Sequence, residues 1–161
     1  MEQRIPPQNV EAEQAVLGAM LLSHDAVIVA MEKLQPRDFY RDAHRIIFEA
    51  MEHLHRENKE IDVITLPEEL NRMKKMDDVG GVGYVLNLPN MVGTASNAEY
   101  YANIVVEKAL SRNLISTCTA LATEAYDGEK KTEDLLDDAE RRILQLSDTK
   151  NRGDFASVGT V

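Results

Sequence analysis

The residues that could do chemistry in this 161-residue chain do not combine into a recognisable catalytic site. Gly80, Gly81 and Gly83 are the only candidate for a phosphate-binding loop. A phosphate loop needs the pattern Gly-x-x-x-x-Gly-Lys-Ser/Thr, and neither that pattern nor its lysine occurs in the chain. We therefore interpret the three glycines as a turn with close backbone packing.

The titratable residues likewise favour structural interpretations. His53 and His55 are two residues apart, so a helix turns them to different faces, and no cysteine pair or His-Glu-x-x-His motif completes a zinc site. His44 falls on an apolar helical stripe, where we expect a core histidine that donates to a backbone carbonyl. The acidic pairs at 77–78 and 137–138 stand among many other charges and indicate solvated surface. We expect no catalytic residue, no cofactor-binding residue and no metal ligand in this fragment.

The overall composition predicts an all-α protein. Hydrophobic residues make up 43% of the chain, aromatic residues only 5%, and tryptophan is absent, which suits helix-on-helix packing better than a sandwich. The single Cys118 excludes an internal disulfide framework, and we expect a reduced, packed thiol and a cytoplasmic protein. We find no membrane-spanning run and no signal peptide. The net charge of −10 repels phosphate, so we expect little direct binding of nucleic acid.

Hydrophobic spacing predicts a compact multi-helix head over residues 1–95. The first helix is apolar on nearly every side, which is typical of a buried central helix. Asp25 is expected to cap the second helix, Asn58 to end the third, and Asp62 or Thr65 to cap the fourth. The five expected helices cover residues 10–22, 25–34, 40–57, 65–75 and 84–88.

An antiparallel helical hairpin is predicted over residues 96–147. Ser96 and Glu99 match a capping box, and no glycine or proline follows until after Tyr126, which predicts a helix of about 30 residues and roughly 45 Å. Gly128 fits a left-handed cap, and Thr132 can begin the return helix. Residues 148–161 have the composition of an interdomain linker, and we expect them to be disordered.

The long helix carries more apolar surface than one partner helix covers. Its first apolar line consists of Ile104, Lys108, Ser111, Ile115, Cys118 and Ala122. Its second apolar line consists of Val106, Leu110, Leu114, Leu121 and Ala125. The return helix has a single apolar stripe, made of Leu135, Leu136, Ala139, Ile143 and Leu146, which one of these lines can bury. The other line docks either on the rest of the domain or on another copy of the chain, and the residue pattern leaves both open.

Several segments together resemble one family. Residues 4–18 read RIPPQNVEAEQAVLG and resemble the opening of the N-terminal domain of DnaB-type replicative DNA helicases. The resemblance covers residues 4–147 and continues in the same order through DFY at 38–40, DVITLPEEL at 62–70, VGGVGY at 79–84, AEYYANIVVEK at 98–108 and DLLDDAE at 134–140.

This resemblance implies a collar domain of a bacterial or phage hexameric ring helicase that acts in DNA replication within the primosome. Such a collar is a trimer of dimers that docks primase and a helicase loader. The DNA-binding motor, a hydrolase that uses ATP and magnesium, lies beyond a linker, so we expect this fragment to be non-catalytic. We expect self-association through the hairpin, with primase facing Glu11 and Tyr84. The expected self-association residues are Val106, Leu110, Leu114, Ile115 and Leu121.

The chain departs from the family pattern at Pro67 and Pro89, so we expect a later start of the fourth helix and a shorter helix near Tyr84. It also begins almost directly at Arg4, without a longer leading arm. Two alternatives remain from the residues alone. One is a free-standing helical adaptor outside replication, and the other is a small hydrolase that uses its acidic groups.

Overall fold

The computed structural model describes residues 4–158, with side chains described up to residue 148. Within that range the chain forms α-helices and short 3-10 helices and contains no strand, so the predicted all-α class is confirmed. The chain divides into two compact units, which we treat separately. We call Gln8–Ala109 the head, and the second unit combines Leu110–Val161 with Met1–Pro7.

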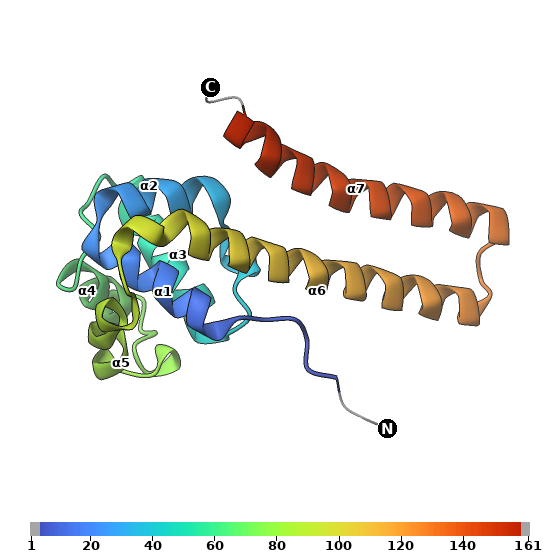
Figure 1. Cartoon of the computed structure of the whole chain (residues 1–161). Helices are drawn as coiled ribbons and strands as arrows, with labels where there is room; N and C mark the ends of the chain where they lie inside the picture. Colours follow the sequence, from blue (N-terminus) through green and yellow to red (C-terminus); the bar gives the residue numbers. More distant parts are fainter. Residues whose placement is uncertain (1–3, 159–161) are drawn as a thin grey trace. The chain divides into compact units, whose positions relative to one another are not determined.

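The head contains the five expected helices and the first part of the long helix (Figure 1). Its α-helices are α1 (Val10–Leu22), α2 (His24–Lys33), α3 (Asp42–Arg56), α4 (Thr65–Arg72), α5 (Val82–Asn87) and the beginning of α6 (Ala98–Asp127). Short 3-10 helices connect them: η1 (Pro36–Asp38), η2 (Asp77–Val79), η3 (Leu88–Met91) and η4 (Ala95–Asn97). The head therefore extends to Ala109, past residue 95, where the spacing of apolar residues and the expected cap at Ser96 placed its end.

The core of the head forms around α1. Nine of the 13 residues of this helix are buried, in line with its largely apolar sequence, and it contacts α2, α3 and η3. Phe39 and Phe48 are fully buried beside it, with ring centroids 5.1 Å apart. Met51 and Leu54 continue the same face of α3. Each such side chain stabilises the fold by about 1.5–3 kcal/mol through burial.

The N-terminus of α2 is capped two positions earlier than expected at sequence level. The Oγ atom of Ser23 accepts a hydrogen bond from the backbone N–H of Ala26 at 3.4 Å, so Ser23 is the cap and Asp25 is not. Asp25 lies in the first turn, where its charge favours the helix N-terminus. At the end of α3, Asn58 has φ of 58°, which confirms the expected left-handed C-terminal residue.

Asp62 caps α4. Its Oδ1 atom accepts hydrogen bonds from the N–H groups of Ile64 and Thr65, both at 2.9 Å. In return, the Oγ1 atom of Thr65 accepts from the N–H of Asp62 at 3.0 Å. Pro67 lies in the first turn of α4, where a missing N–H costs little, so α4 starts at Thr65 and not later.

The start of α6 differs from the expected capping box. Thr94 accepts a hydrogen bond from the N–H of Ser96 at 3.4 Å, and η4 precedes the first residue of α6. Ser96 is therefore not the cap. Glu99 lies 3.7 Å from the Nζ atom of Lys33 on α2, as an ion pair.

The glycine turn before α5 is confirmed as a turn. Gly80 and Gly81 have φ values of 100° and 88°, a conformation that glycine adopts without strain. The expected close packing is wrong for Gly81 and Gly83, because a Cβ atom at either position would meet nothing within 4 Å. Pro89 lies in η3, directly after the short α5.

The second unit is a helical hairpin. It joins the part of α6 after Ala109 to α7 (Thr132–Val158) through a turn at Gly128, whose φ is 66° (Figure 1). The left-handed cap at Gly128 is thus confirmed. Helix α7 continues past Ser147, where we expected it to end, to Val158. The role of residues 148–161 as an interdomain linker stays a prediction.

Within the described residues, no helix is both long and apolar enough to cross a bilayer.

Candidate functional site

The hairpin leaves large apolar side chains uncovered. Beyond Ala109, Asp138 is the only buried residue among the described side chains. On α6, Leu114 is 46% exposed and Ile115 is 51% exposed. On α7, Leu136 is 60% exposed and Leu144 is 61% exposed. Apolar side chains exposed together at this level are typical of protein-interaction surfaces.

The five residues expected to mediate self-association fall into three environments. Leu114 and Ile115 are exposed. Leu110 and Leu121 are half-buried within the hairpin unit. Val106 belongs to the head, where it is half-buried and packs against the apolar core. Leu114 and Ile115 therefore offer the most apolar area to a partner.

Helix α7 carries a second exposed apolar strip that sequence reasoning missed. We expected α6 to bury one stripe of α7, and this is wrong for Leu136 and Ile143, which are exposed. A shallow depression follows this side of α7, lined by Leu136, Ala139, Glu140, Ile143, Leu144 and Ser147. Spacings of seven and eight residues put Leu136, Ile143 and Leu144 on one helix face, a signal that the sequence offers.

Charged side chains connect the two helices of the hairpin. Both guanidinium nitrogens of Arg142 on α7 donate to Glu124 on α6, at 2.8 and 2.9 Å. These hydrogen bonds hold the pKa of Glu124 below its usual value. Arg142 also lies 2.7 Å from Asp138, which pairs with Arg141 and Lys130 as well. Asp138 is thus a buried member of an ionic cluster, and its expected place on solvated surface is wrong.

Cys118 also differs from expectation. We expected a packed thiol, but the side chain is exposed on α6. The prediction treated its apolar line as a buried one, whereas the described side chains of this part of α6 are at most half-buried.

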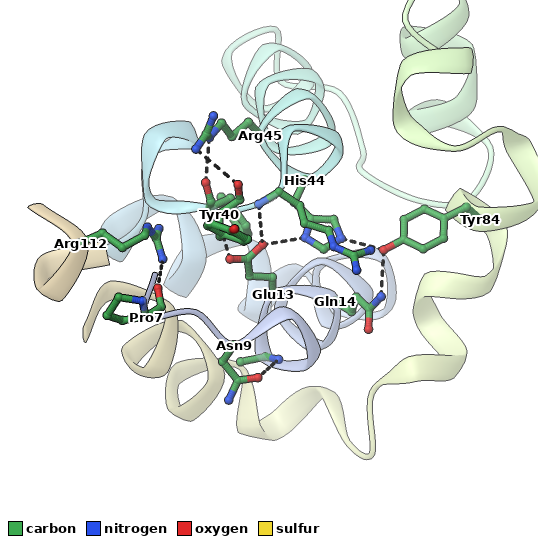
Figure 2. Close-up of polar contacts among 12 residues, drawn as sticks. Pro7, Asn9, Glu13, Gln14, Tyr40, His44, Arg45, Tyr84 and Arg112 are labelled. Carbon is green, nitrogen blue, oxygen red and sulfur yellow. Dashed lines mark hydrogen bonds and ion pairs between the residues drawn. The ribbon is translucent and has the colours of Figure 1, made fainter. Parts of the chain in front are cut away.

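In the head, the two residues expected to face primase lie on neighbouring elements. Glu11 is exposed on α1 and Tyr84 is half-buried on α5. Gln14, three residues after Glu11 and on the same side of α1, donates from Nε2 to the Tyr84 hydroxyl at 3.0 Å (Figure 2). Val82 and Leu86 are exposed beside Tyr84 in sequence. Val82 and Leu86 lie four residues apart on one side of α5, and Tyr84, two residues from each, is turned away from them. We call the exposed pair Val82 and Leu86 the α5 face.

His44 is a core histidine, as expected, but its partners are not. Among the described residues, no backbone carbonyl accepts a hydrogen bond from His44, so the expected bond to a carbonyl is wrong. Its Nδ1 atom lies 2.7 Å from Oε1 of Glu13, and its Nε2 atom lies 2.7 Å from the Tyr84 hydroxyl (Figure 2). The ring planes of His44 and Tyr84 are nearly parallel, at an interplanar angle of 11°, and the ring centroids are 6.1 Å apart.

Glu13 is the functional candidate that sequence reasoning passed over. Its carboxylate is buried inside the head and accepts hydrogen bonds from the N–H of Tyr40 at 2.7 Å and of Arg41 at 3.4 Å. These N–H groups lie directly before α3, so the negative charge also stabilises the start of that helix. A charged residue within a helix that is apolar on nearly every side needs hydrogen-bond donors as partners. The sequence therefore held a signal that Glu13 has a buried polar role.

The head also has a hollow with mixed lining between the start of α2 and the end of α3. Leu22, Val27 and Ile61 contribute apolar surface, and His24, His55 and Lys59 contribute polar groups. Among the described residues, no three His, Cys, Asp or Glu side chains are grouped so that they could hold a metal ion.

The part of the chain that matches a known family model covers most of the head. Residues 5–107 match the family model described as the DnaB-like helicase N terminal domain. The chain is 44% identical over 156 residues to the replicative DNA helicase DnaB of Geobacillus stearothermophilus, covering 97% of this chain and 34% of that protein. It is 43% identical over 161 residues to the replicative DNA helicase DnaC of Bacillus subtilis, covering 100% and 36%. The chain therefore spans about a third of the length of these relatives.

Two solved structures share the fold. The N-terminal domain of DnaB helicase from Mycobacterium tuberculosis has a TM-score of 0.82 at 40% identity, over 88% of this chain and 99% of that one. A DnaB-like replicative helicase, whose structure was reported with its interactions with primase, has a TM-score of 0.70 at 24% identity, over 86% and 31%. These likenesses argue against a free-standing adaptor. This chain belongs to the DnaB-like helicase N-terminal domain family.

Proposed function

We propose that this chain is the N-terminal collar domain of a hexameric replicative DNA helicase. In this role it mediates subunit assembly through the hairpin and docks primase and a helicase loader during DNA replication. The observation that carries the proposal is the uncovered apolar surface of the hairpin in a member of this family. The mechanism is geometric, because the domain sets the spacing of subunits and offers a platform for partners.

Self-association is supported by the chemistry of the hairpin surface. Leucine and isoleucine side chains exposed on both helices gain free energy when a second copy excludes water from them, at about 25 cal/mol per Å² of apolar area. In this account the hairpins pair as dimers, three dimers form the collar, and the complete protein is a hexameric ring. A symmetric dimer would use the same surface from both copies.

Primase docking is proposed for the head. Glu11 and the α5 face combine an exposed carboxylate with exposed apolar side chains, a mixture found at protein interfaces. The fold relative whose structure was reported with its interactions with primase supports the choice of partner.

ATP and magnesium belong to a separate motor in this account. The glycine turn at Gly80 and Gly81 leads into α5, whose sequence VGYVLN contains no lysine to reach a phosphate. This glycine turn therefore does not fit a nucleotide phosphate. The net charge of −10 makes this domain a poor binder of DNA, so strand contacts also fall to the motor. We place the protein in the cytoplasm, where replication proceeds.

The experiment that tests this proposal is a binding titration with purified primase from Geobacillus stearothermophilus or Bacillus subtilis, the species of the two relatives described above. The 161-residue chain is expected to bind, and Glu11→Ala is expected to weaken binding. Glu133→Ala, at an exposed glutamate on α7, serves as the control and is expected to have no effect. No saturable binding to either primase would contradict the docking role.

A further inference from the structure

A continuous series of hydrogen bonds leads from the interior of the head to Tyr84 on α5, the helix that carries the α5 face. Glu13 on α1 contacts Nδ1 of His44 on α3, and Nε2 of His44 contacts the hydroxyl of Tyr84 on α5, each at 2.7 Å (Figure 2). Glu13 and His44 are both buried, whereas Tyr84 is half-buried. The partly exposed aromatic ring is therefore fixed from within by two side chains that a partner cannot touch.

The donors and acceptors of the hydrogen bonds among Gln14, Tyr84, His44 and Glu13 define one arrangement of protons. The Tyr84 oxygen accepts from Gln14, and its single hydrogen is then available to His44 Nε2. His44 is accordingly neutral, with its hydrogen on Nδ1, where it is donated to the Glu13 carboxylate. Every hydrogen then has an acceptor, and the carboxylate accepts from two backbone N–H groups as well.

The other two protonation patterns are worse matched. A hydrogen on Nε2 alone would turn the bare lone pair of Nδ1 toward the Glu13 carboxylate at 2.7 Å. A doubly protonated His44 would make the Tyr84 oxygen accept from both Gln14 and His44, and the phenolic hydrogen would then need a further acceptor. Glu13 thus selects the tautomer of His44, and this tautomer selects the direction of the Tyr84 hydroxyl.

The α5 helix needs such an anchor because it is short. It spans Val82–Asn87 and follows two glycines in left-handed conformations, Gly80 and Gly81. So short a helix has little stability of its own, so its position depends on tertiary contacts. The Tyr84 hydroxyl supplies polar contacts to both α1 and α3 at once.

We propose that Glu13 and His44 are positioning residues of the α5 face: they hold Tyr84 with its hydroxyl inward, so that the face is preformed for docking primase. This inference rests on the proposed function of the head. Preformed surfaces bind more tightly because less conformational freedom is lost on association. Neither Glu13 nor His44 contacts the partner, and both act through Tyr84.

The first test reads the tautomer directly. Nitrogen-15 NMR of the 161-residue chain should show His44 neutral and protonated on Nδ1. In Glu13→Gln, the amide oxygen can still accept from Tyr40 while the amide nitrogen donates to Nδ1, so His44 should switch to the Nε2-protonated tautomer. The same tautomer in both proteins would overturn the inference.

The second test is a double-mutant cycle with the primase probes named above. Tyr84→Phe keeps the ring and removes only the hydroxyl, and it should weaken binding about fivefold, the usual weight of one hydrogen bond. Glu13→Gln should weaken binding similarly, and the double variant should be no weaker than either single one. Tyr126→Phe, at an exposed tyrosine on α6, is the matched control and should bind like the unaltered chain.

The outcomes separate the two proposals. Binding losses that simply add in the double variant would mean that Glu13 acts on stability alone, which overturns the positioning role. Unaltered affinity in Tyr84→Phe would overturn it too, while leaving primase docking intact. Should Glu13→Gln fail to fold, the comparison of Tyr84→Phe with Tyr126→Phe decides by itself. No binding by the unaltered chain would overturn the docking function and the positioning role together, whatever tautomer His44 adopts.

Discussion

Gly18 on α1 lies directly against the backbone carbonyl of Leu88 in η3. A Cβ atom built on Gly18 would be 2.2 Å from the Leu88 oxygen and 2.9 Å from its carbonyl carbon. Helix α1 can therefore contact η3 only because residue 18 has no side chain. This contact fixes the segment that follows α5, and with it the surface that we propose for docking.

Gly18→Ala should accordingly destabilise the head. The added methyl group meets backbone atoms, which cannot move aside as a flexible side chain would, so the expected loss is about 1–3 kcal/mol. Urea unfolding followed by circular dichroism measures this loss.

Gly83→Ala is the matched control for this substitution. A Cβ atom at Gly83 meets nothing within 4 Å, and alanine favours helix by up to about 1 kcal/mol over glycine. This variant should be as stable as the unaltered chain or slightly more so. Equal stability of Gly18→Ala and Gly83→Ala would contradict the tight packing of α1 on η3.

Acid should weaken the head through Glu69. This side chain is buried on α4, where hydrogen bonds from Arg72, and next the charges of Arg72 and His53, lower the pKa of its carboxyl below the usual 4.5. The folded state therefore binds the proton less readily than the unfolded state. The stabilisation is present at neutral pH, and it is lost as the pH falls through 4.5 toward the lowered pKa.

Glu69→Gln tests this pH dependence. The variant should be less stable than the unaltered chain at pH 7, and its urea midpoint should fall less steeply on acidification. Glu68→Gln changes an exposed neighbour and should reproduce the unaltered curve. Parallel pH profiles for Glu69→Gln and the unaltered chain would count against the role of Glu69.

Arg142→Gln should loosen the hairpin without weakening the head. The substitution removes both hydrogen bonds to Glu124, and Glu124 and Asp138, the partners of Arg142, both belong to the hairpin unit. Amide hydrogen exchange should quicken along α7, while the exchange of α1 and α3 stays unchanged. Lys131→Gln, at an exposed residue beside the turn, should leave both regions as they are. Unchanged exchange in α7 of Arg142→Gln would remove these ion pairs from the forces that hold the hairpin.

The sequence predicted the helices well because their signals are local. The apolar run and flanking residues of α1 gave both of its bounds, and Gly128 and Asn58 have the left-handed conformation that their residue types favour. Two caps were expected two residues too late: Ser23 caps α2, and Thr94 caps η4, the short helix before α6. Ser23 and Asp25, or Thr94 and Ser96, are all good capping residues, and only the path of the chain decides between them.

The candidate site could be predicted only in part because it depends on long-range partners. The pattern placed His44 in the core, yet its hydrogen bonds reach Glu13 and Tyr84, which are far away in the sequence. The surplus apolar surface of the hairpin was foreseen for α6. The exposure of Leu136 and Leu144 on α7 was missed. How much of α7 is covered by α6 depends on how the two helices pack, which the spacing of residues along one helix does not give.

The most direct test of the account is the mass of the 161-residue chain by sedimentation equilibrium over a wide concentration series, beside that of Ile115→Glu. The account predicts that the mass rises well above that of a single copy with concentration. It also predicts that Ile115→Glu shifts this rise to higher concentration while helicity persists, because assembly would bury the introduced charge. A chain that stays monomeric throughout, or a variant with an unchanged mass curve and unchanged primase binding, would contradict assembly through the exposed hairpin surface.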